Sequence, residues 1–142
     1  MNVKKRTPKI IYWIVGLTAL TILRAQTIFF FPLLEMNGGD NPNAWFAPWV
    51  SDTILGLLVP VVIYFLLKGK GVKTWALLIM YSAIGAFDYA NGLAAQWHYP
   101  MAEKTASSAL VFGSLSFTLT IQTIAVILLF RKEVMNHFFK IK

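Results

Sequence analysis

The chain has 142 residues, of which 57% are hydrophobic and only 13% are charged, and its formal net charge is +7. A soluble domain usually carries about 25% charged residues, so this composition indicates a membrane protein. The absence of cysteine excludes disulfides, thiolate metal sites and iron–sulfur clusters.

The first apolar segment covers residues 10–34 and follows a basic amino terminus. Its start resembles a signal peptide, but residues 23–26 read Leu-Arg-Ala-Gln, which is a poor cleavage site. We therefore expect this segment to be retained as a membrane span.

Three further apolar segments cover about residues 48–67, 74–97 and 109–130. Each is long enough to cross a hydrocarbon core of roughly 30 Å at about 1.5 Å per residue. A turn-rich stretch separates the first two segments, and a short basic turn at residues 68–73 separates the second from the third. The sequence thus predicts an all-α membrane protein, a four-transmembrane-helix bundle built as a single domain over residues 1–142.

The basic residues give this bundle an orientation. Eleven of the 13 lie at the amino terminus, in the turn at 68–73 or after residue 130: Lys4, Lys5, Arg6, Lys9, Lys68, Lys70, Lys73, Arg131, Lys132, Lys140 and Lys142. Short cytoplasmic loops are enriched in Lys and Arg, so we expect both termini to be cytoplasmic in a cell membrane. The same topology accounts for the net positive charge without a nucleic-acid partner.

Aromatic and apolar residues near the segment ends are typical of the membrane interface. The outer end is expected to carry anchors at Trp45, Trp49, Trp97 and Tyr99. The tail after residue 130 alternates basic residues with apolar ones, as an interfacial segment would: Val134, Met135, Phe138, Phe139 and Ile141.

Arg24 and Asp88 are charged residues inside predicted spans. Each lies 14 residues into its segment, counted from Ile10 and from Thr74, and the two segments run in the same direction. The two side chains therefore reach a similar depth. Because an isolated charge at that depth costs several kcal/mol, we expect them to form an ion pair in the outer half of the bundle.

Asp52 allows two interpretations. It lies 15 residues before Leu67 on an oppositely directed segment, which brings it to a similar height and makes it a candidate second carboxylate near Arg24. Ser51, Asp52 and Thr53 are also typical of the first turn of a helix that starts late. The sequence leaves both open.

The expected ligand-binding site is the polar part of this outer half: Arg24, Asp52, Asp88, Tyr89, Asn91, Gln96 and His98. Asp88 and Asn91 share one small or polar helical face, and His98 closes the third segment. Ser114, Thr118 and Gln122 form a polar stripe on the fourth segment, but such stripes also serve ordinary helix packing in membranes.

The residue inventory argues against several cofactors. A haem held by two histidines is excluded because His98 and His137 lie on opposite sides of the membrane. A retinal Schiff base needs a lysine within a span, and every lysine falls in a loop or tail. No spacing of His, Asp or Glu matches a metal-ligand motif. We expect no cofactor and no metal.

Three functions remain compatible with these features. The first is binding or transport of a small ligand, with Arg24 expected to attract an anionic group. The second is a non-catalytic accessory or assembly subunit, acting as a homo-oligomer or within a larger membrane complex. The third is an intramembrane enzyme with Asp88 as general acid or base beside His98 or Tyr89, which no catalytic motif supports. The sequence favours a non-enzymatic protein in contact with membrane lipids.

Overall fold

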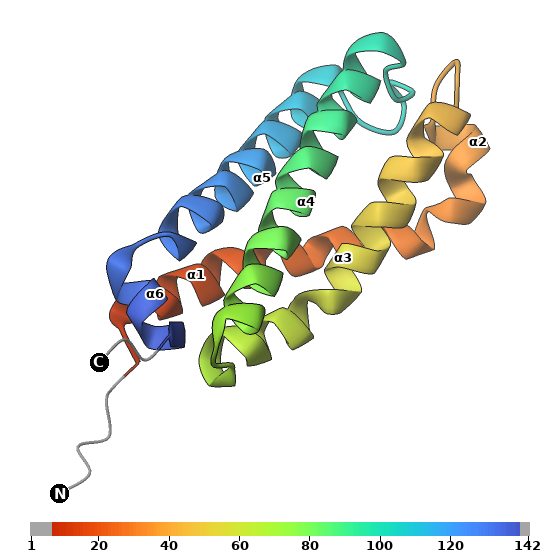
Figure 1. Ribbon diagram of the computed structural model, residues 1–142. Helices are drawn as coiled ribbons and strands as arrows, with labels where there is room; N and C mark the ends of the chain where they lie inside the picture. Colours follow the sequence, from red (N-terminus) through yellow and green to blue (C-terminus); the bar gives the residue numbers. More distant parts are fainter. Residues whose placement is uncertain (1–6, 140–142) are drawn as a thin grey trace, which may run out of the picture.

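The computed structural model describes residues 7–139, and over that range the protein is helical, with no strand (Figure 1). In chain order the elements are α1 (Lys9–Leu20), the 3-10 helices η1 (Thr21–Phe29) and η2 (Phe31–Leu33), α2 (Leu34–Asn37), α3 (Asn43–Lys68), α4 (Val72–His98), α5 (Ser108–Leu129) and α6 (Lys132–Phe139).

Three of the described helices are long and apolar enough to cross a membrane: α1 continued by η1 (Lys9–Phe29), α3 and α5. The protein therefore has the helices of a membrane protein. The fourth long helix, α4, has 27 residues, so its length is sufficient, but polar side chains such as Asp88, Asn91 and Gln96 make it less apolar than the other three.

The outer surface of the bundle is apolar. Large aromatic side chains on all four long helices project outward, with exposed fractions of 72% for Trp13, 68% for Phe87 and 63% for Phe117, and 77% for Phe29 at the end of η1. Phe87 lies on α4, so this helix presents the same kind of surface as its neighbours. An apolar surface of this extent fits contact with lipid tails rather than with water.

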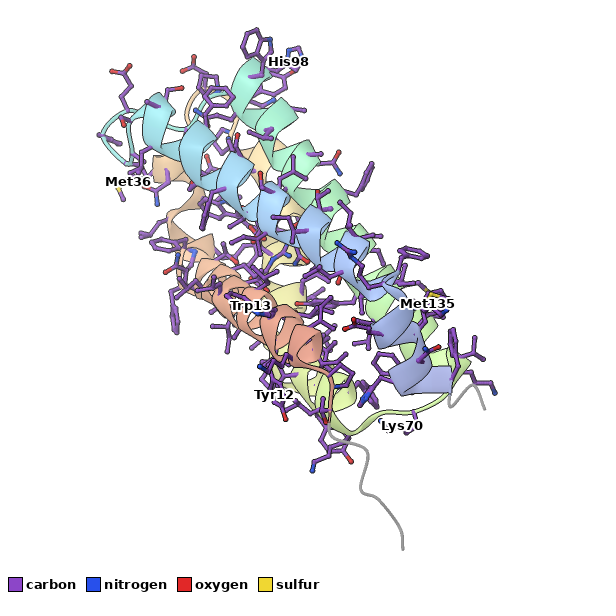
Figure 2. The ribbon with its side chains drawn as sticks, turned by 90° about the vertical axis from the view of Figure 1, so that its left-hand side faces the viewer. Tyr12, Trp13, Met36, Lys70, His98 and Met135 are labelled. Atoms are coloured by element: carbon purple, nitrogen blue, oxygen red, sulfur yellow. The ribbon has the colours of Figure 1, made fainter. Side chains whose placement is uncertain are left out.

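The long helices lie side by side, so that the loops gather at two ends (Figure 1). The start of α1, the α3–α4 turn and α6 are at one end, while α2 and the α4–α5 loop are at the other. Figure 2 shows Lys70 and Met135 at the first end and Met36 and His98 at the second. Five of the basic residues on which the predicted orientation depends lie outside the described residues: Lys4, Lys5, Arg6, Lys140 and Lys142.

The apolar side of α6 packs into the bundle. Val134 and Phe138 are 0% and 1% exposed, in a core cluster with Ile11, Leu66 and Leu129. The tail is amphipathic as expected, but these two residues are buried among helices rather than at a lipid surface; Ile141 lies outside the described range.

Two contacts attach α6 to the α3–α4 turn. The Gly71 amide donates to the Phe138 carbonyl over 2.9 Å, and Lys70 Nζ lies 2.8 Å from His137 Nε2. Burial, and secondarily the Lys70 ammonium, lower the pKa of His137. A neutral His137 ring can accept a hydrogen bond from Lys70.

Candidate functional site

The first predicted span changes from an α-helix to a 3-10 helix in the part that contains Arg24. After α1 the chain forms η1, a 3-10 helix of nine residues, although such helices seldom exceed three or four. With three residues per turn, Thr21, Arg24 and Thr27 share one edge, whereas in an α-helix they would drift by about 60° at each step. Thr21 and Arg24 are buried, while the residues between them face outward.

Hydroxyl groups and one close approach hold η1 against α3. Thr27 Oγ1 donates to the Arg24 carbonyl over 2.8 Å and lies 2.8 Å from Thr53 Oγ1 on α3. A Cβ at Gly56 of α3 would lie 2.4 Å from the Ala25 amide nitrogen, so only glycine permits this crossing. The polar edge of η1 is thereby turned toward α3 and α4.

Arg24 pairs with two carboxylates. Its Nε donates to Asp52 Oδ1 over 2.7 Å and its Nη2 to Asp88 Oδ2 over 2.5 Å. Ser51 Oγ donates to the other Asp88 oxygen. Arg24, Asp52 and Asp88 are together called the Arg24 cluster below. The predicted Arg24–Asp88 pair is confirmed. Asp52 is the tenth residue of α3, so its first-turn interpretation is wrong because the helix starts early, at Asn43.

Two more side chains complete the surroundings of the guanidinium. The Arg24 Cζ atom lies 4.3 Å from the ring centroid of Tyr89, in a cation–π arrangement. Arg24 Nη1 and Gln122 Nε2 are the buried side-chain atoms without a hydrogen-bond partner within residues 7–139. Both approach Gly85, at 3.1 and 2.8 Å from the position a Cβ would take there. Gln122 thus brings α5 to the cluster.

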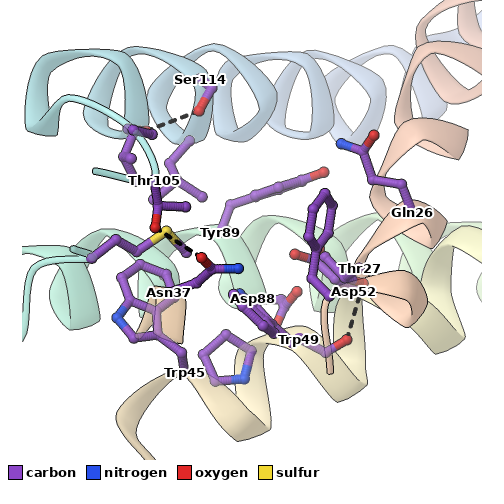
Figure 3. A pocket seen from close by; sticks show the side chains of 17 residues that line it. Gln26, Thr27, Asn37, Trp45, Trp49, Asp52, Asp88, Tyr89, Thr105 and Ser114 are labelled. Carbon is purple, nitrogen blue, oxygen red and sulfur yellow. Dashed lines mark hydrogen bonds between the residues drawn. The ribbon is translucent and has the colours of Figure 1, made fainter. Parts of the chain in front are cut away.

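A pocket of about 310 Å³ lies between this cluster and the loops at the α2 end (Figure 3). Asp52, Asp88 and Tyr89 line it beside the cluster, and Trp45 and Trp49 contribute aromatic walls from α3. The remaining lining residues are neutral: Gln26, Thr27, Phe30, Asn37, Pro48, Gly92, Met101, Thr105, Ala106, Val111, Ser114 and Leu115. Arg24 itself is not among the residues that line the pocket.

Hydrogen bonds of the α4–α5 loop to α2 and α3 lie at the far end of the pocket. Thr105 Oγ1 donates to Asn37 Oδ1 over 2.9 Å, and the Ala102 amide donates to the Asn37 carbonyl over 3.0 Å. Trp45 Nε1 donates to the Tyr99 carbonyl over 2.9 Å. The α4–α5 loop is therefore attached both to α2 and to the start of α3.

The other predicted site residues lie elsewhere. Asn91 is exposed and lines, together with Ser51 and Asp88, a second depression of about 470 Å³ between α3 and α4. Gln96 is 1% exposed, and its amide group donates to Ser108 Oγ and accepts from the Met101 amide, which holds the α4–α5 loop. His98 is exposed at the end of α4.

The sequence analysis did not predict several of the residues that line the pocket. Trp45 and Trp49 were expected as interfacial anchors, but they are 2% and 6% exposed and pack inside the bundle. Their spacing of four residues, which places them on one helix face, was the available signal. The polar stripe containing Gln122 was visible, but nothing in one sequence separates such a stripe from ordinary helix packing.

Within the described chain, no group of three or more His, Cys, Asp or Glu residues is arranged to hold a metal ion. The pocket presents carboxylate oxygens, aromatic faces and neutral hydrogen-bonding groups. No family model, curated protein or solved structure matches the chain.

Proposed function

We propose that this protein binds or transports a small ligand in the pocket beside the Arg24 cluster. The support is that a charge cluster inside a membrane protein forms one wall of a cavity. Intramembrane charges are costly and usually mark a ligand or ion pathway. The pocket, at about 310 Å³, lies within the size range of small-molecule sites, and a purely structural ion pair would need no such space.

The membrane arrangement that we propose has four spans, α4 being the fourth, with both termini cytoplasmic in a cell membrane. It is supported by the 11 of 13 basic residues that belong to one predicted side and by the outward Phe87 on α4. In this arrangement the pocket lies in the outer half, and the α2 and α4–α5 loops face the exterior. A ligand would enter from outside or from the outer leaflet.

A binding screen on the purified full-length protein in lipid nanodiscs tests the proposal. Mass spectrometry of molecules that co-purify from native membranes supplies the candidates, and equilibrium binding ranks them. Ala106→Trp fills the pocket, and Ala109→Trp places the same ring on the exposed face of α5 as a control. We expect a ligand that binds the wild type and the control but not the filled variant. A screen without any such ligand overturns the proposal.

A further inference from the structure

We propose that the ligand is an organic cation, an ammonium group carried on an apolar body. This inference rests on the proposed function, because it specifies the chemistry that the same pocket recognises. It also differs from the anionic ligand expected from Arg24 alone.

The first support is the charge of the Arg24 cluster. One guanidinium is paired with two carboxylates, so the cluster carries a formal excess of one negative charge. The side chains of Arg24, Asp52 and Asp88 are only 2%, 17% and 10% exposed, so water does little to offset this excess. An uncompensated charge is costly in a low-dielectric interior, and a cation in the adjoining pocket would compensate it.

The second support is the distribution of free acceptors and donors. Asp88 uses one oxygen for Arg24 and the other for Ser51. Asp52 accepts from Arg24 through Oδ1 and lines the pocket, so its carboxylate is the one that can accept a hydrogen bond from a ligand there.

The guanidinium, in contrast, is poorly placed for an anion. Its Nε and Nη2 are occupied by the two carboxylates, and its remaining Nη1 is buried beside Gly85 and Gln122. An anion in the pocket would meet the carboxylates first. Every charged residue on the pocket wall is acidic, so the electrostatics favour a cation.

The third support is the aromatic lining. The pocket is lined by Trp45 and Trp49 of α3, by Tyr89 of α4 and by Phe30, which follows η1. Aromatic faces attract cations through the ring quadrupole and also provide apolar contact area. Tyr89 already holds the Arg24 guanidinium in this way. A ligand with both an ammonium group and an apolar body matches this combination.

The test measures equilibrium binding of 2-phenylethylammonium, whose N–H groups can donate to Asp52, to the full-length protein in nanodiscs. Phenylacetamide and phenylacetate are the neutral and anionic probes of similar size. We expect the cation to bind and the other two not to compete. Asp52→Asn should weaken cation binding at least about tenfold, which is about 1.4 kcal/mol. It leaves the Arg24–Asp88 pair intact, and a thermal melt checks its folding. Glu103→Gln, in the exposed loop, should bind like the wild type.

The outcomes separate this inference from the proposed function. Equal cation binding by the wild type and Asp52→Asn would show that the carboxylate is not the recognition group, and the inference fails. Binding of phenylacetate instead, lost in Ala106→Trp, overturns the cation but keeps a ligand pocket. If none of the three probes binds, the inference fails and the proposed function is decided by the screen alone. The probe series on the wild type needs no variant to fold.

Discussion

Arg24 is the residue on which the polar interior depends. It lies between two carboxylates and over the ring of Tyr89. The contacts of its guanidinium therefore link three helical elements, η1, α3 and α4. The attraction within a buried ion pair adds little to the free energy of unfolding, because both charges had to leave water. Removing one partner costs much more, since the other charge then stays buried without compensation. The consequence of losing Arg24 is therefore larger than that of losing the whole cluster.

Replacing Arg24 alone should destabilise the protein more than replacing all three charged residues. We expect Arg24→Met to lower the free energy of unfolding by about 3–5 kcal/mol, because it leaves two adjacent buried carboxylates unpaired. Arg24→Met combined with Asp52→Asn and Asp88→Asn should lose less. Unfolding in detergent, followed by circular dichroism, measures both. Lys73→Met, which removes an exposed charge, is the control, and additive losses across the three positions would contradict the coupling.

At the scale of elements, the junction of η1 and α3 places the cluster. The 3-10 geometry of η1 turns Thr21, Arg24 and Thr27 to one edge, and Gly56 lets the α3 backbone come close to Ala25. Pro60 removes an amide donor from α3 nearby, and Tyr81 of α4 donates to the Leu55 carbonyl over 2.9 Å in the same region. The three helical elements therefore meet where α3 lacks its regular hydrogen bond.

A single methyl group at Gly56 should disturb this junction. The Cβ of Gly56→Ala would contact the Ala25 backbone, which cannot rotate away as a side chain can, so η1 must shift and the Arg24–Asp52 distance must increase. We expect a loss of about 1–3 kcal/mol in the free energy of unfolding. Any cation binding should fall with it.

Gly113→Ala on α5 is the matched control for this variant. Nothing lies within 4 Å of a Cβ at Gly113, and alanine in a helix is favoured over glycine by about 0.5–1 kcal/mol. It should therefore leave the stability unchanged or raise it. Equal stability of the two variants in the same unfolding assay would show that the η1–α3 approach is not tight.

At the scale of the whole molecule, the two ends of the bundle differ in charge and in contents. The end that holds the α3–α4 turn and α6 carries Lys68, Lys70, Lys73, Arg131 and Lys132, while the opposite end carries α2 and the α4–α5 loop beside the pocket. The core is divided in the same way, with aliphatic residues beside α6 and Trp45, Trp49 and Val111 near the pocket. One end is thus filled by packed aliphatic side chains, and the other encloses the pocket.

Fusion reporters test the proposed orientation of this asymmetric bundle. A reporter at residue 142 and one within residues 68–73 should both report the cytoplasm, because the basic residues hold those segments inside. A reporter inserted at Asp40, exposed in the loop before α3, should report the exterior. A cytoplasmic signal at Asp40, or an external one from the turn, would overturn the orientation and place the pocket on the other side.

The sequence by itself determined the properties that depend only on position along the chain. Hydropathy indicated helices able to cross a membrane, and counting residues along parallel segments predicted that Arg24 and Asp88 reach the same depth and pair. Depth follows from the rise per residue, and a buried charge requires a partner. Both inferences need no knowledge of how the helices are rotated.

Only the tertiary structure decided which polar residues share a cavity, because that depends on helix rotation and on which neighbour each face meets. Asn91 shares a second depression with Asp88 but does not line the pocket beside Asp52 and Tyr89, and Gln96 bonds to the α4–α5 loop. Asp52, left open by the sequence, joins Arg24 because α3 starts at Asn43 and Gly56 brings η1 close. The local sequence specifies a helix and its faces, but contacts between distant segments determine the pocket.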